Sequence, residues 1–142
     1  MIPIFTLLFL LAAPAPLTLD QVKADPNPEH RAKAAIDYAS YAERNAETAY
    51  SKGEMQSVDS ELKNVQESIE AADEALVASH KTPGRNPGPY KYAELRSREL
   101  LIRLGDLEQK MDTTERTLIS AVKSRVQEIH DAWFEGIMGR KR

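Results

Sequence analysis

Small apolar residues recur with a seven-residue repeat between positions 28 and 52. Alanines follow one another at steps of three and four residues, so they share one face of an α-helix. The six are Ala32, Ala35, Ala39, Ala42, Ala46 and Ala49. Because methyl groups are small, the axis of a second helix can come to about 8 Å, the lower limit of the usual range of about 8–10 Å. This alanine stripe therefore predicts a closely packed helix pair.

A second helix with larger apolar residues is predicted directly after Gly53. A glycine can adopt the positive φ with which many helices end, so the first helix stops there and the next begins near Glu54. The apolar positions of this second helix are Met55, Val58, Leu62, Val65, Ile69, Ala72 and Leu76. Large side chains facing small ones fill space well, which predicts an antiparallel helical hairpin.

The proline- and glycine-rich segment 82–89 ends the second helix, and a third begins near Pro89 or Tyr90. The apolar stripe of the third helix runs to Met111. Beyond it, Asp112 and Glu115 have the spacing of a capping box, which predicts that a fourth helix starts at Asp112. Without that break, a single helix of about 48 residues would reach roughly 70 Å.

A break at Asp112 produces four helices of similar length. The sequence therefore predicts an all-α fold, an up-down-up-down four-helix bundle over residues 29–138. The alternative is a three-helix bundle with a long, dimerising third helix.

The N-terminal residues have the pattern of an export signal. Ile2 to Ala13 is apolar but too short to span a bilayer, and small residues and prolines follow it. We expect a signal peptide over residues 1–15, with cleavage as late as residue 24, and a periplasmic or secreted protein. Prolines at 26 and 28 predict an extended segment over residues 16–28. Residues 139–142 form a basic tail.

Composition and charge exclude several classes of function. The chain has no cysteine, which rules out disulfides, a thiol nucleophile and a zinc–thiolate site. Its formal charge is −3, with an acidic first half and a basic second half. Since no basic stripe is interleaved with aromatic residues, we expect no nucleic-acid partner.

Three histidines are candidate metal ligands. His30, His80 and His130 would lie at the same end of a four-helix bundle, where imidazoles could hold Zn²⁺ or Cu²⁺. No local pair such as HxxxH supports a site, so we predict no metal and no other cofactor.

Glu43 and Glu47 share a helix face and could form a carboxylate pair. Because Glu43 lies beside the alanine stripe, we expect it to be exposed.

Aromatic residues are the candidate interaction residues. Tyr38, Tyr41 and Tyr50 flank the alanine stripe, where rings with a polar tip could bind a peptide or a hydrophobic ligand. Trp133 continues the apolar positions of the last helix and precedes the basic tail. That combination could make a weak contact with a membrane surface.

Several short stretches together resemble a set of small exported bacterial helical proteins that have no assigned activity. They are Pro28-Glu29-His30-Arg31, Arg85-Asn86-Pro87, the stretch from Tyr92-Ala93-Glu94-Leu95 through Leu104, Glu128-Ile129-His130-Asp131 and Gly136-Ile137-Met138-Gly139. The resemblance implies an exported helical protein and no particular chemistry.

From the residues we expect a non-catalytic protein, because no nucleophile, base and orienting group can be assembled. The leading hypothesis is an exported bundle that acts through contacts with a protein partner, as a scaffold, adaptor or chaperone-like binder. A homodimer is compatible with it. The alternative is a periplasmic carrier of a small ligand or metal.

Overall fold

The structure, a computed structural model, describes residues 18–139, and in that range it is all-α. Its helices are α1 (Leu19–Lys23), α2 (Pro28–Ser51), α3 (Met55–Ala78), α4 (Pro87–Lys110) and α5 (Arg116–Ile137). The prediction of an all-α fold is confirmed. The expected signal peptide and all but Gly139 of the expected basic tail lie outside the described residues. None of the helices between residues 18 and 139 is both long and apolar enough to cross a membrane.

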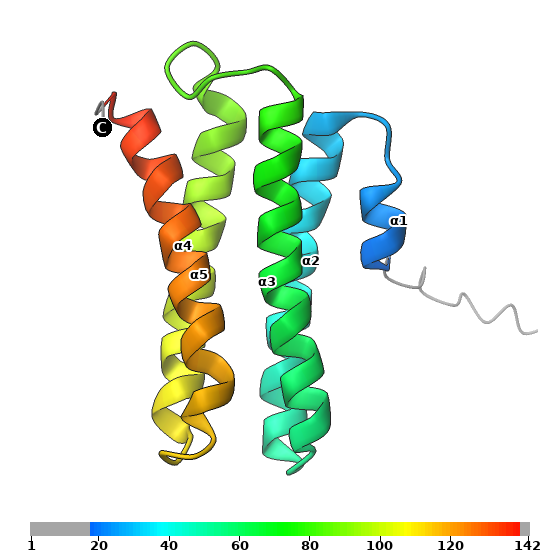
Figure 1. Cartoon of the computed structure of the whole chain (residues 1–142), viewed down its shortest axis with the longest axis vertical. Coiled ribbons are helices and arrows are strands. Elements are labelled where there is room, and N and C mark those ends of the chain that lie inside the picture. The colour runs from blue at the N-terminus through cyan, green and yellow to red at the C-terminus, as the bar shows by residue number, and fades with distance from the viewer. Residues whose placement is uncertain (1–17, 140–142) are drawn as a thin grey trace, which may run out of the picture.

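The four long helices form two antiparallel hairpins that lie side by side (Figure 1). The first hairpin is α2 with α3, and the second is α4 with α5. Between the hairpins, α2 packs beside α4 and α3 packs beside α5, whereas α3 and α4 barely touch. The connection after α3 therefore crosses the top of the bundle diagonally, and the neighbours α2 and α4 run in the same direction.

The alanine stripe is the buried face of α2, as the sequence predicts. All six alanines are at most 6% exposed, and those in the middle of the helix are fully inaccessible. Opposite them α3 contributes large buried residues, including Leu62 and Ile69. The pair α2–α3 has the most extensive contact in the bundle. Small residues thus pack against large ones along the whole hairpin.

The turn between α2 and α3 depends on Gly53. Its φ is +72°, in the left-handed region that costs a glycine little. The Glu54 amide donates to the Ala49 carbonyl at 3.0 Å, and the Gly53 amide donates to the Tyr50 carbonyl at 3.0 Å. These two bonds satisfy carbonyls at the end of α2 that have no partner within the helix. The predicted helix boundary is confirmed.

The connection of residues 79–86 packs onto the end of α5 through Gly136. A Cβ atom at position 136 would lie 2.8 Å from Cγ of Pro83, closer than side chains tolerate. The Tyr90 hydroxyl also donates to the Lys81 carbonyl at 2.9 Å. These contacts hold the diagonal connection against the bundle.

The prediction of an extended segment over residues 16–28 is wrong for residues 19–23, which form helix α1. Thr18 Oγ1 accepts from the Gln21 amide at 3.2 Å, and Gln21 Oε1 accepts from the Thr18 amide at 2.9 Å. This capping box starts a short helix whose Val22 is buried in the core. The prolines interrupt helical structure only after α1, from Pro26 onward.

The break between α4 and α5 lies at the predicted position. Asp112 Oδ1 accepts from the Glu115 amide at 2.8 Å, and Glu115 Oε1 accepts from the Asp112 amide at 3.0 Å. The two residues form the expected reciprocal box within a turn, and α5 begins at Arg116. The Arg116 guanidinium donates to the Met111 carbonyl at 3.0 Å, and the Tyr50 hydroxyl donates to the Lys110 carbonyl at 2.8 Å. The carbonyl end of α4 is therefore well satisfied.

Replacing Asp112 with alanine should destabilise the protein by about 0.5–2 kcal/mol, because the Glu115 amide loses its acceptor. Urea unfolding followed by circular dichroism measures the loss. Thr113→Ala is the matched control, since Thr113 is exposed beside Asp112. A more stable Asp112→Ala variant would contradict the break, because alanine strengthens a continuous helix.

Candidate functional site

The structure does not gather the three histidines into a metal site. His30 is exposed in the first turn of α2, and His80 is exposed just after α3. His80 has a φ of +58°, so its backbone ends α3 where a glycine is more usual. His130 lies in α5 and contacts two carboxylates. Between residues 18 and 139, no three histidine, aspartate or glutamate side chains are placed to share a metal ion.

The predicted aromatic residues lie in different parts of the bundle. The rings of Tyr38 and Tyr41 are 5.8 Å apart on α2, and Tyr41 is 39% exposed. Burial raises the pKa of Tyr38, and the charge of Glu61 on α3 raises it further. Tyr50 lies at the far end of α2, where its hydroxyl binds the turn before α5. These tyrosines do not form one continuous surface.

Trp133 is part of the core. Its side chain is 2% exposed, and its indole nitrogen donates to Asp73 Oδ1 of α3 at 2.9 Å. An indole N–H buried among apolar residues needs such an acceptor. The role of Trp133 in this arrangement is to join α5 to α3.

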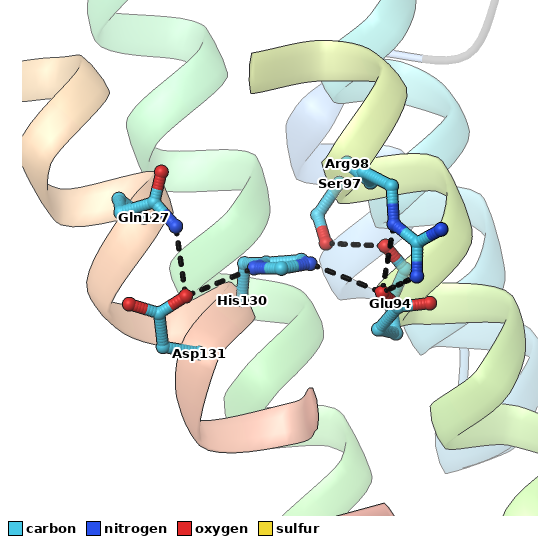
Figure 2. A network of polar contacts seen from close by, with 6 residues as sticks. All are labelled: Glu94, Ser97, Arg98, Gln127, His130 and Asp131. Carbon is cyan, nitrogen blue, oxygen red and sulfur yellow. Dashed lines mark hydrogen bonds and ion pairs between the residues drawn. The ribbon is translucent and has the colours of Figure 1, made fainter. Parts of the chain in front are cut away.

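A polar cluster joins α4 to α5 around His130 (Figure 2). His130 Nε2 lies 3.2 Å from Glu94 Oε1, and Nδ1 lies 3.2 Å from Asp131 Oδ1. The Arg98 guanidinium also donates to Glu94, with Nε at 3.0 Å. The Glu94 side chain is only 6% exposed, so these two donors compensate a carboxylate that is almost out of water.

This cluster lacks an activated nucleophile. The Ser97 hydroxyl donates to the Glu94 backbone carbonyl at 3.0 Å, within its own helix, and not to the imidazole. Both ring nitrogens of His130 face carboxylates, which are acceptors when ionised. We interpret the cluster as a link between α4 and α5.

Glu43 is fully buried, and the expectation that it is exposed is wrong. It stands one heptad after Ile36, on the side of α2 that faces α4. Neither of its carboxyl oxygens has a hydrogen-bond partner of normal geometry, and Arg103 Nη1 lies 3.9 Å from Oε2. An ionised carboxylate in this place would be poorly compensated.

Burial raises the pKa of Glu43 from 4.5 to about 8. The nearby Glu47 carboxyl adds to the shift, whereas the charges of Arg103 and Arg44 oppose it. At neutral pH the Glu43 side chain is therefore mainly protonated and uncharged.

A groove with a volume of about 340 Å³ runs between α2 and α4 beside Arg103. We call it the α2/α4 groove. It is lined by Ser40, Arg44, Arg96, Glu99, Leu100, Ile102 and Arg103. Arginine side chains thus come together from two helices that are not consecutive in the chain, α2 and α4. Only the parallel packing of α2 beside α4 creates this surface.

Two of the three arginines in the groove lack a charged partner. Arg96 pairs with Glu99 at 3.3 Å and lies 3.7 Å from Asp37. The carboxyl near Arg103 is that of Glu43, which is mainly neutral at pH 7. Arg44 makes no ion pair within residues 18–139. The groove therefore carries uncompensated positive charge.

An apolar strip adjoins the α2/α4 groove on the outer face of α4. Leu95 and Ile102 are seven residues apart, so they share a face, and they are 52% and 61% exposed. They lie away from the buried positions of α4, and the sequence reasoning overlooked them. Both are apolar residues outside the buried stripe that includes Ala93 and Leu100, and this position could have identified them in the sequence as exposed.

Comparisons of this chain with family models, with curated proteins and with solved structures find no match.

Proposed function

We propose that this chain is an exported, non-catalytic helical bundle that acts through protein contacts, as a scaffold, adaptor or chaperone-like binder. Its binding surface in this proposal is the α2/α4 groove. The observation that supports it is the pair of uncompensated guanidinium groups, Arg44 and Arg103, beside the exposed side chain of Ile102.

The partner that fits this surface is an acidic protein segment with apolar side chains. Guanidinium groups bind carboxylates with two parallel hydrogen bonds, which favours an acidic residue at Arg44 and Arg103. The exposed side chain of Ile102 favours an apolar residue next to it. A nucleic acid is the poorer fit, because Glu99 also lines the groove and the chain is acidic overall.

We further propose that the functional unit is an up-down-up-down four-helix monomer. Support comes from the core, in which both later helices bury their apolar stripes within one chain; Leu104 of α4 and Val126 of α5 are inaccessible. A long dimerising helix would need a partner to cover its second half.

Export belongs to the same proposal and is supported by the sequence of residues 2–13. The packing of α1 favours the earlier cleavage position, after residue 15. Cleavage after residue 24 would remove Val22, which is 2% exposed in the core.

A synthetic acidic peptide tests the binding function. We expect an amphipathic peptide of about 14 residues, with glutamate and leucine on one face, to bind the full bundle. Its counterpart with glutamine in place of glutamate should bind about five- to thirtyfold more weakly, since two partly exposed ion pairs contribute about 0.5–1 kcal/mol each. Fluorescence anisotropy at two salt concentrations measures both affinities.

Matched double variants locate the site. Arg44→Gln/Arg103→Gln should abolish the preference for the acidic peptide. Lys63→Gln/Arg85→Gln removes the same charge from exposed positions elsewhere and should retain it. Equal effects of the two double variants would show that net charge, and not the α2/α4 groove, determines binding.

A further inference from the structure

A small, mainly apolar cavity lies at the end of the bundle where α2 and α4 begin and α3 ends. Its volume is about 170 Å³. It is lined by Glu29, His30, Ala32, Lys33, Ile36, Leu76, Pro89 and Tyr92. An engineered apolar cavity of about 150 Å³ holds a benzene molecule. The cavity is half open to solvent, and its volume matches that of one aromatic ring or a short alkyl chain.

The floor of the cavity is hydrophobic and belongs to the core. Ala32, Ile36 and Leu76 are at most 2% exposed, and they come from both helices of the first hairpin. The ring of Pro89 and the ring of Tyr92 close the side that faces α4. Such a floor favours an apolar body over a polar one.

The rim of the cavity carries one cation, Lys33, that has no carboxylate partner among the described residues. Lys33 Nζ lies 5.4 Å from the centre of the Tyr92 ring and makes no ion pair within the described residues. The imidazole of His30 likewise makes no hydrogen bond or ion pair there. The acidic lining residue, Glu29, is paired with Lys81. The Tyr92 hydroxyl is also engaged, because it donates to Asp37.

We propose that this cavity binds a small monocarboxylate with an aromatic or short alkyl body. The body fills the space above Ile36 and Leu76, and the carboxylate lies at Lys33 on the rim. This site is separate from the α2/α4 groove, so it stands whether or not a protein segment binds there. It would make the protein a small-ligand carrier as well as a binding bundle.

Benzoate is the probe that tests the site, and benzyl alcohol is its uncharged counterpart of similar size. We expect benzoate to bind in the millimolar range, as fragments of this size do. In NMR spectra of the full bundle, the methyl signals of Ala32, Ile36 and Leu76 should shift most. Benzyl alcohol should move the same signals with roughly three- to fivefold lower affinity, the contribution of a rim ion pair.

Lys33→Met removes the rim charge and keeps an unbranched side chain only one heavy atom shorter. It should weaken benzoate binding by about the same three- to fivefold and leave benzyl alcohol unchanged. Lys91→Met is the matched control, because Lys91 is an exposed lysine of α4 that does not line the cavity. It should bind both probes as the wild type does.

Three results would overturn the proposal. The first is the absence of methyl shifts at tens of millimolar benzoate. The second is a set of shifts centred on other residues. The third is equal affinity for benzoate in the wild type and in Lys33→Met.

Discussion

Replacing Glu43 with glutamine should remove a fall in stability that the wild type shows as the pH rises towards 8. Glutamine has nearly the same shape as glutamic acid and stays uncharged at every pH. The free energy of unfolding of the two proteins should therefore converge at low pH. At high pH the glutamine variant should be more stable, by at most about 5 kcal/mol.

The sign follows from the raised pKa of Glu43. In the unfolded chain this carboxyl ionises near 4.5, whereas in the folded protein it keeps its proton up to about 8. Between these values the folded state binds more protons than the unfolded state, so stability falls as pH rises. The slope for one proton is at most about 1.4 kcal/mol per pH unit. Below 4.5 the carboxyl is protonated in both states and the stabilisation is complete.

Urea unfolding at several pH values between 4 and 9 measures the effect. Glu67→Gln is the matched control, because Glu67 is an exposed glutamate on α3. Its stability should follow the wild-type pH profile. If stability depends on pH in the same way in the wild type and in Glu43→Gln, Glu43 is ionised at neutral pH. Arg103 would then have a charged partner, and the α2/α4 groove would carry less uncompensated charge.

Ala42→Leu should cost about 1–3 kcal/mol of stability. Ala42 is fully buried in the alanine stripe, where α2 makes its most extensive contact with α3. Three extra carbon atoms have no room there without moving a helix or forcing a strained side-chain conformation. Thermal and urea unfolding should both report the loss.

Arg44→Leu is the control for Ala42→Leu. Arg44 is exposed two residues further along α2, and arginine and leucine have similar helix propensities. Its stability should stay within about 0.5 kcal/mol of the wild type. Small and equal effects at both positions would mean that the alanines favour helix formation and do not determine the packing distance.

Features that depend on local pattern could be predicted from the sequence. The alanine stripe, the turn at Gly53 and the capping box of Asp112 and Glu115 each depend on spacings of three to five residues between successive members. The same kind of signal was present for α1, in Thr18 and Gln21, but was overlooked.

Features that depend on which helices are neighbours could not be predicted. Helical periodicity shows which face of a helix is buried, but it does not show which other helix covers that face. The α2/α4 groove needs Arg44 and Arg103 side by side, and the cluster at His130 needs Glu94, 36 positions away.

The burial of Glu43 could have been predicted from the sequence, but it was not. Ile36 lies seven residues before it and Tyr50 seven residues after it, and this heptad position faces the interior of the bundle. A glutamate there was assigned to the surface because it lies beside the alanine stripe and not in it. The heptad pattern carried the better signal.

The most direct test of the proposed binding surface is an NMR titration of the full bundle with the acidic peptide. We expect the largest amide shifts at Ser40, Arg44, Leu100 and Arg103, the residues that line the α2/α4 groove. Shifts centred instead on Tyr38 and Tyr41, or an unchanged spectrum at saturating peptide, would contradict the proposal that this groove binds the partner.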